Sequence, residues 1–237
     1  MFAFLHRFFG SRSTASPVDS AAARTTEAYQ SPFEPLFRQA PDYLTLLGLG
    51  PEARPTLQFI IDVVRENPRY RQTVLELLAD PGWRLHLVAA MAVLFSRDRT
   101  DLCPALWEAM DRGSWVAPQL GVVLSICDPH FVAHAKQRIV NGCPVAPANI
   151  PSELERHVIV GSGGPSQRSA KNLATLLHLV HAIPGESEWA DATSQAPDLH
   201  QLLRTDPDQC DRLAACWTAA LRDRLAELGL PVDGLAV

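Results

Sequence analysis

The sequence predicts an all-α fold of stacked helix pairs, a helical solenoid, on the basis of three observations. Residues 81–142 contain an internal repeat that places Trp83 over Trp115, 32 residues apart, with small and apolar residues in register after each tryptophan. Apolar residues recur at spacings of three and four along most of the chain, as they do on one face of a helix. Four Asn-Pro or Asp-Pro pairs, at Asn67, Asp80, Asp128 and Asp206, are suited to begin helices. A repeat of this length with a helix in each half is typical of helical solenoids.

The chain of 237 residues is expected to form a tail and one domain. Residues 1–30 join a Phe-rich start to a stretch of Ser, Thr, Ala and Pro, which buries too little apolar surface to offset the entropy of ordering. We expect a flexible tail with a short amphipathic start. Residues 31–237 carry the apolar periodicity, and a chain of this length can bury a sizeable core. They are expected to form a single α-helical, repeat-like domain.

The first half of the domain is expected to be helical with short breaks. A turn is expected at 42–47, where prolines punctuate the entry, and a helix with one buried stripe is expected over 52–66. Further helices are expected after Asn67, after Asp80, from Asp101 to Gly113, over 115–126, and from Asp128 to Asn141. The helix over 115–126 is apolar on nearly all sides, so we expect it to be the buried inner member, with Pro118 in its first turn.

The second half is expected to be less regular. After a short apolar segment at 154–160, residues 170–177 align with 117–124 at an offset of 53, which predicts a third copy with about twenty residues inserted ahead of it. Residues 184–211 hold seven acids and the single cation Arg204, and we expect an acidic loop with one short helix at 199–203. The final helix, 207–228, has one polar face and is expected to cap the end of the stack.

Charge and cysteine usage exclude several classes of protein. The net charge is −5, and residues 101–237 carry ten Lys and Arg against sixteen acids, so the basic footprint of a nucleic-acid-binding protein is missing. Five cysteines form no CxxC pair, which favours reduced thiols packed as small apolar residues in a cytoplasmic protein. No stretch reaches the ~20 apolar residues of an integral membrane segment.

The sequence contains no recognisable catalytic motif, and we expect no catalytic residue, metal or cofactor. His130 and His134 lie four residues apart on a predicted helix, but no acid stands between them as in HExxH, so ordinary surface histidines are the favoured interpretation. His178 and His181 are expected to flank a buried stripe. Asp206, which could form a carboxylate pair with Asp208, is already expected to cap a helix.

A glycine-rich segment at 161–171 is the candidate for binding a small anion. Gly163 and Gly164 could present backbone N–H groups at a helix N-terminus, with Arg168 and Lys171 supplying positive charge. The segment lacks the GxxxxGK[ST] order of a phosphate loop, so a loop that simply leads into a helix is the favoured interpretation.

The acidic segment is the candidate surface for a partner protein. Trp189 lies among carboxylates, and an aromatic residue in such a setting can anchor an interface. The candidate contact residues are Glu186, Glu188, Trp189, Asp191 and Asp198. The competing interpretation is an ordinary solvated loop.

Two resemblances add to this interpretation. Residues 80–91 and their echo from Ser114 resemble HEAT-like repeats, in which an acid-led turn opens a helix of the form Arg-x-x-Ala-Ala-x-x-Leu. The likeness covers roughly residues 52–183 and implies an irregular solenoid of about three helix pairs. In general appearance the chain is also similar to bacterial immunity proteins, which neutralise secreted toxins.

Three functions remain open from sequence. The first is a non-enzymatic binding module, an immunity-type or antitoxin-like inhibitor that covers a basic toxin or effector with residues 186–211, since complementary charge speeds association. The second is an enzyme or small-molecule sensor that uses 161–171, with His157 as an accessory residue. The third is a membrane-peripheral scaffold attached through residues 2–9.

Overall fold

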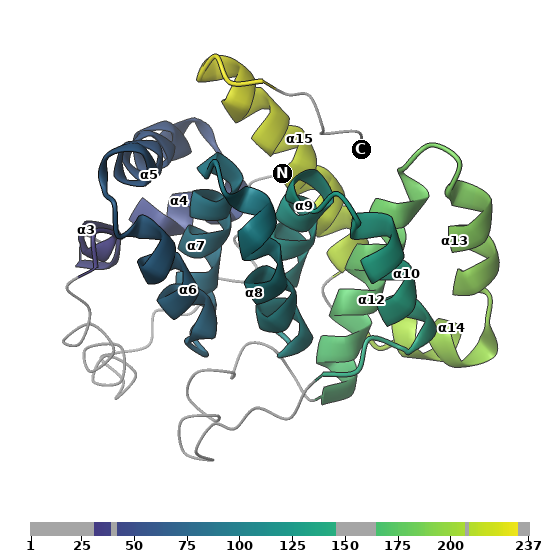
Figure 1. Cartoon of the computed structure of the whole chain (residues 1–237). Coiled ribbons are helices and arrows are strands. Elements are labelled where there is room, and N and C mark those ends of the chain that lie inside the picture. Colours follow the sequence, from purple (N-terminus) through teal and green to yellow (C-terminus); the bar gives the residue numbers. More distant parts are fainter. Residues whose placement is uncertain (1–30, 39–41, 146–164, 207–208, 232–237) are drawn as a thin grey trace, which may run out of the picture.

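The computed structural model describes residues 31–38, 42–145, 165–206 and 209–231. Every regular element within these ranges is a helix, with no strand among them, which confirms the all-α fold (Figure 1). None of these helices combines the length and the apolar character that a membrane span requires. The predicted tail 1–30 and the apolar segment 154–160 lie outside the described residues.

The helices follow one another with short connections. Two short helices and two 3₁₀ turns make the entry: α3 (Glu34–Arg38), η1 (Asp42–Leu44), α4 (Thr45–Gly48) and η2 (Pro51–Ala53). The central helices are α5 (Arg54–Glu66), α6 (Tyr70–Ala79), α7 (Trp83–Phe95), α8 (Arg99–Asp111), α9 (Ala117–Cys127) and α10 (Phe131–Val140). The last group is α12 (Pro165–His181), α13 (Ser187–Ser194), α14 (Pro197–Leu203) and α15 (Cys210–Glu227).

The central helices form two rows. In one row α7 contacts α5 and α9, and α9 contacts α12; in the other, α6 contacts α8, and α10 lies beyond α8 (Figure 1). Helices α7 and α9 touch neighbours in both rows, and this explains why their sequences are apolar on nearly all sides. All residues from His86 to Leu94 and from Ala117 to Leu124 are buried, so the predicted inner position of the 115–126 segment is confirmed.

Equivalent positions of the predicted repeat meet in space. The ring centres of Trp83 and Trp115 are 4.7 Å apart, at the starts of α7 and α9. Helices α8 and α10 begin at Arg99 and Phe131, which are also 32 residues apart. The sequence offset therefore aligns the pair α7 and α8 with the pair α9 and α10.

The predicted Asn-Pro and Asp-Pro helix starts act as turns that precede the helix. Side-chain oxygens of Asn67, Asp80 and Asp128 each accept the backbone N–H two residues on, at 2.7–2.9 Å. The helices then begin three residues after the cap rather than at the proline, because this turn occupies the intervening residues. The predicted start at Asp101 was wrong: α8 begins at Arg99, after Ser96 accepts the N–H of Asp98.

The acidic segment contains more helix than the sequence predicted. Residues 187–194, expected to be loop, form α13, and α14 extends the expected 199–203 helix to Pro197. Helix α13 lacks an apolar stripe, and only Ala190 is buried, so periodicity gave no signal for it. Both helices pack against α12.

The last helix does not sit at the end of the stack as predicted. Helix α15 crosses the molecule against α9 and α12 and reaches the N-terminal α4 (Figure 1). Its buried residues Trp217 and Leu221 face this interior, and the Trp217 indole donates to the Leu46 carbonyl oxygen at 2.9 Å. The apolar stripe of α15 explains the difference, because it packs against both α9 and α12 rather than against one terminal pair.

Gly121 allows α9 and α12 to approach closely. A Cβ at this position would lie 2.7 Å from Thr175 Cγ2 and 3.0 Å from Leu179 Cδ1. We expect Gly121→Ala to lower the free energy of unfolding by about 1 kcal/mol, because overpacking costs about 1–3 kcal/mol and the helix preference for alanine returns about 0.5–1 kcal/mol. Urea denaturation measures the change. In a Thr175→Ser background, which removes Cγ2, the loss should shrink or reverse.

Candidate functional site

Three exposed carboxylates lie on the adjoining helices α13 and α14, which we call the acidic surface: Glu188, Asp191 and Asp198. Glu188 falls in the first turn of α13 and Asp198 in the first turn of α14, where the helix dipole favours negative charge. Within the described residues, none of the three forms an ion pair with Lys or Arg. Asp191, 71% exposed, lies 3.4 Å from His181 Nε2.

The other two predicted contact residues are engaged within the molecule. Lys136 Nζ, from α10, lies 2.5 Å from a Glu186 carboxylate oxygen and 4.6 Å from the centre of the Trp189 ring. Trp189 is half-buried and packs against the core. The structure thus brings Glu186 and Trp189 together around Lys136, beside the acidic surface, and Trp189 does not stand out as an exposed anchor.

The predicted anion site is not formed as expected. Gly163 and Gly164 lie outside the described residues, whereas Arg168 and Lys171 are 7% and 2% exposed on the inner face of α12. Arg168 Nη1 lies 3.4 Å from the Arg112 carbonyl oxygen, and Asn172 donates to the Met110 carbonyl oxygen at 2.8 Å. Arg168 therefore faces the C-terminal end of α8, where a helix dipole favours a cation. Because both side chains are buried, neither positive charge is available to an anion in the solvent.

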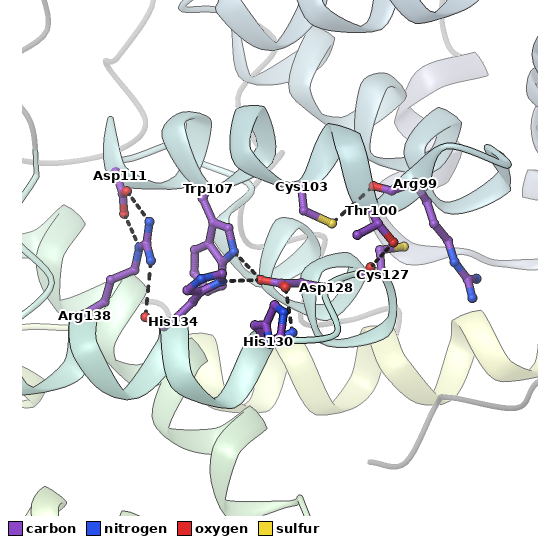
Figure 2. A network of polar contacts seen from close by, with 10 residues as sticks. All are labelled: Arg99, Thr100, Cys103, Trp107, Asp111, Cys127, Asp128, His130, His134 and Arg138. Atoms are coloured by element: carbon purple, nitrogen blue, oxygen red, sulfur yellow. Dashed lines mark hydrogen bonds and ion pairs between the residues drawn. The ribbon is translucent and has the colours of Figure 1, made fainter.

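A polar network joins α8, the turn between α9 and α10, and α10 itself (Figure 2). Asp128 is buried, and its Oδ2 accepts hydrogen bonds from Trp107 Nε1 at 2.8 Å and His134 Nδ1 at 2.7 Å. Its Oδ1 accepts the backbone N–H of His130. The Arg138 guanidinium donates two bonds of 2.8 Å to the Asp111 carboxylate and lies 4.0 Å from the Trp107 ring centre.

The network keeps Asp128 ionised. Burial alone would raise the pKa of Asp128, but hydrogen bonds from His134, Trp107 and the His130 backbone outweigh it and lower the pKa. Because an ionised carboxylate only accepts, His134 donates its Nδ1–H and holds Nε2 unprotonated in the neutral imidazole. The imidazole is thus held in one orientation on a side chain that is 44% exposed.

No nucleophile completes a catalytic triad in this network. Burial raises the pKa of the neighbouring Cys103 and Cys127 thiols to about 12, so both remain protonated and unreactive. No Ser, Thr or Cys side chain among the described residues hydrogen-bonds to His134. Nor does any group of three or more His, Cys, Asp or Glu in that part of the chain form a metal cluster.

The remaining polar candidates have structural roles. Burial lowers the pKa of His86 to about 4. The neutral imidazole therefore donates Nε2–H to the Asp80 carbonyl oxygen at 2.6 Å and accepts from Ser114 at Nδ1, joining the turns before α7 and α9. His178 is half-buried, and burial lowers its pKa. Asp206 accepts the backbone N–H of Cys210, the first residue of α15, but the N-cap position is Gln209 rather than Asp206; Asp208 lies outside the described residues.

Sequence reasoning missed two features of these sites. Asp128 was predicted only as a helix cap, and nothing in its spacing indicated that its second oxygen would meet Trp107, 21 residues earlier. No sequence pattern indicated a role for Lys136, because it is an isolated cation on a predicted helix. Both contacts join helices distant in sequence, so only the packing reveals them.

Comparison of the chain with models of known protein families, with curated proteins and with solved structures finds no match.

Proposed function

We propose that this chain is a non-enzymatic binding module that holds a basic partner protein, a toxin or effector, on its acidic surface, as an immunity-type inhibitor does. The observation that carries the proposal is the set of exposed carboxylates Glu188, Asp191 and Asp198, which face solvent on two adjoining helices without a Lys or Arg partner among the described residues. A surface of one sign steers an oppositely charged partner and sets the register of binding.

The scaffold suits such a role. We infer that the two rows of helices form an irregular HEAT-like solenoid of about three pairs, supported by the contact between Trp83 and Trp115 and by the matching starts of α8 and α10. Rigid stacked helices hold α13 and α14 against α12 in fixed positions, so the carboxylates bind without a large ordering cost.

Two further observations favour a non-enzymatic cytoplasmic protein. Three buried groups that could serve as nucleophile or base have a pKa unsuited to chemistry near neutral pH: about 12 for Cys103 and Cys127, and about 4 for His86. All five cysteines lie in the described residues and none forms a disulfide, as expected of a protein kept in a reducing compartment.

Charge reversal on the acidic surface tests the proposal. We expect a triple variant to fail to capture the basic proteins that the unmodified chain captures from its native source; its substitutions are Glu188→Lys, Asp191→Lys and Asp198→Lys. The rate at which this variant associates with the captured partner should be lower by about tenfold or more. Capture is measured by quantitative mass spectrometry, and the rate by surface plasmon resonance.

A matched control separates this surface from net charge. Glu52, Glu66 and Glu108 are exposed acids on other parts of the molecule, and their replacement by Lys changes the net charge equally. The control should keep the partner. A partner that the acidic-surface variant retains, or that the control variant loses to the same extent, would count against the proposal.

A further inference from the structure

His130 and His134 lie one helical turn apart at the start of α10 and share its outer face. Their ring centres are 6.1 Å apart, with the ring planes at 71°. His130 is exposed, and 44% of the His134 side chain is exposed. In the described part of the chain neither ring nitrogen of His130, nor Nε2 of His134, has a hydrogen-bond partner. Three imidazole nitrogens are thus available to solvent on one face.

The spacing of the rings fits chelation of one ion. Two nitrogens that each bind a metal at about 2.1 Å lie at most about 4.2 Å apart. Rings with centres 6.1 Å apart meet this limit when their nitrogen edges turn toward each other. His130 supplies the adjustment, because no hydrogen bond from the described residues holds its exposed ring, whereas His134 is already held by Asp128.

Asp128 prepares His134 to bind a metal. Metal-binding histidines usually donate their other ring N–H to a carboxylate, which fixes the tautomer and makes the binding nitrogen more basic. The Asp128 carboxylate accepts Nδ1–H from His134 at 2.7 Å and is itself fixed by Trp107 at 2.8 Å. The turn before α10 uses only Oδ1, so the bond from His134 to Oδ2 is additional to the role of Asp128 in that turn.

The local charge also permits a cation. The N-terminus of a helix disfavours positive charge. Here the ionised carboxylate of Asp128 lies at that terminus, and the nearby Arg138 guanidinium is paired with Asp111. The second histidine pair offers no such site, because His178 is half-buried and His181 contacts Asp191.

We propose that His130 and His134 form an open two-imidazole site for a late first-row divalent metal ion, with Asp128 as a positioning residue that does not touch the ion. Imidazole suits Cu²⁺, Ni²⁺ and Zn²⁺, with Cu²⁺ bound most tightly, whereas Ca²⁺ and Mg²⁺ require oxygen ligands. Water fills the remaining coordination positions, which leaves the ion exchangeable and open to a further ligand.

Titration of the full chain with Cu²⁺, Ni²⁺, Zn²⁺ and Mg²⁺ tests the site. The background binding is that of the His130→Ala, His134→Ala double variant. Beyond this background, isothermal titration calorimetry should show one equivalent of bound Cu²⁺. Binding of Ni²⁺ and Zn²⁺ should be weaker, and binding of Mg²⁺ should be absent. Bound Cu²⁺ should also quench tryptophan fluorescence, because the Trp107 ring centre is 6.1 Å from that of His134. Each single His→Ala variant should reduce binding to the background level.

His200→Ala, at an exposed histidine on α14, is the matched control and should bind as the unmodified chain does. Asp128→Asn should weaken the affinity about 10–100-fold, and long-range ¹H–¹⁵N spectra should show loss of the single His134 tautomer. Circular dichroism confirms that each variant is folded. Equal binding by the unmodified chain and the double variant, or binding lost only in His200→Ala, would overturn the proposal.

Discussion

Replacing Trp217 by alanine should lower the free energy of unfolding by about 3–5 kcal/mol, the range for truncating a buried tryptophan. Trp217 is 3% exposed in the contact of α15 with the body of the molecule, and its indole N–H is bonded to the Leu46 carbonyl oxygen. The variant loses the packing and leaves a buried carbonyl without its donor. Urea denaturation followed by circular dichroism measures the change.

Trp217→Phe distinguishes packing from hydrogen bonding at the same position. Phenylalanine keeps one aromatic ring in the contact but removes the N–H and part of the indole, so the expected loss is smaller, about 1–3 kcal/mol. A Trp217→Ala variant as stable as the unmodified protein would show that α15 does not hold the fold together.

Asp128→Ala should be the second most damaging substitution, lowering the free energy of unfolding by about 2–4 kcal/mol. The buried Trp107 indole N–H loses its acceptor, which costs about 1–3 kcal/mol, and the turn before α10 loses its hydrogen bond to the His130 N–H, which costs about 1 kcal/mol. Chemical denaturation near neutral pH measures the loss. Asp223→Ala, at an exposed acid on α15, should stay within about 0.5 kcal/mol of the unmodified protein.

The cost of Asp128→Ala should depend on pH. The pKa of Asp128 is lower in the folded chain than its unfolded value of about 3.9. Its contribution is therefore fully present above about pH 4 and is lost as the pH falls through the lower folded value. The stability difference between Asp128→Ala and the unmodified protein should shrink in that acid range. A difference that stays constant there would contradict an ionised, hydrogen-bonded Asp128.

Local pattern was sufficient to predict most helices but not their arrangement. The apolar run after Trp115 predicted α9 and its burial, because a helix apolar on all sides has no face for solvent. Gly113 and Gly142 closed helices where expected, with φ of 79° and 71°. Helix α13 escaped prediction because packing against α12, rather than its own sequence, stabilises it. The place of α15 depends on contacts with α9 and α12, and in part with α4, which no local signal encodes.

The candidate sites were predictable in part. The exposure of Glu188, Asp191 and Asp198 follows from an acidic segment, since carboxylates remain in water unless paired. Arg168 and Lys171 were predicted as the positive charge of a candidate anion site, and their burial was not foreseen, because the carbonyl groups ending α8 offer Arg168 a buried environment. Glu186 and Trp189 were expected to meet a partner, and instead meet Lys136 from a helix some fifty residues earlier.

The hydrogen bond between Trp217 and Leu46 joins positions 171 residues apart, so during translation Leu46 is synthesised long before its partner. At roughly 5–20 residues per second, the ribosome adds the intervening residues in about 10–30 s. During that interval the nascent chain contains α4, and later α9 and α12, whose apolar surfaces are not yet covered by α15. Such surfaces bind chaperones or aggregate. The protein therefore completes this part of its fold only after α15 has been synthesised.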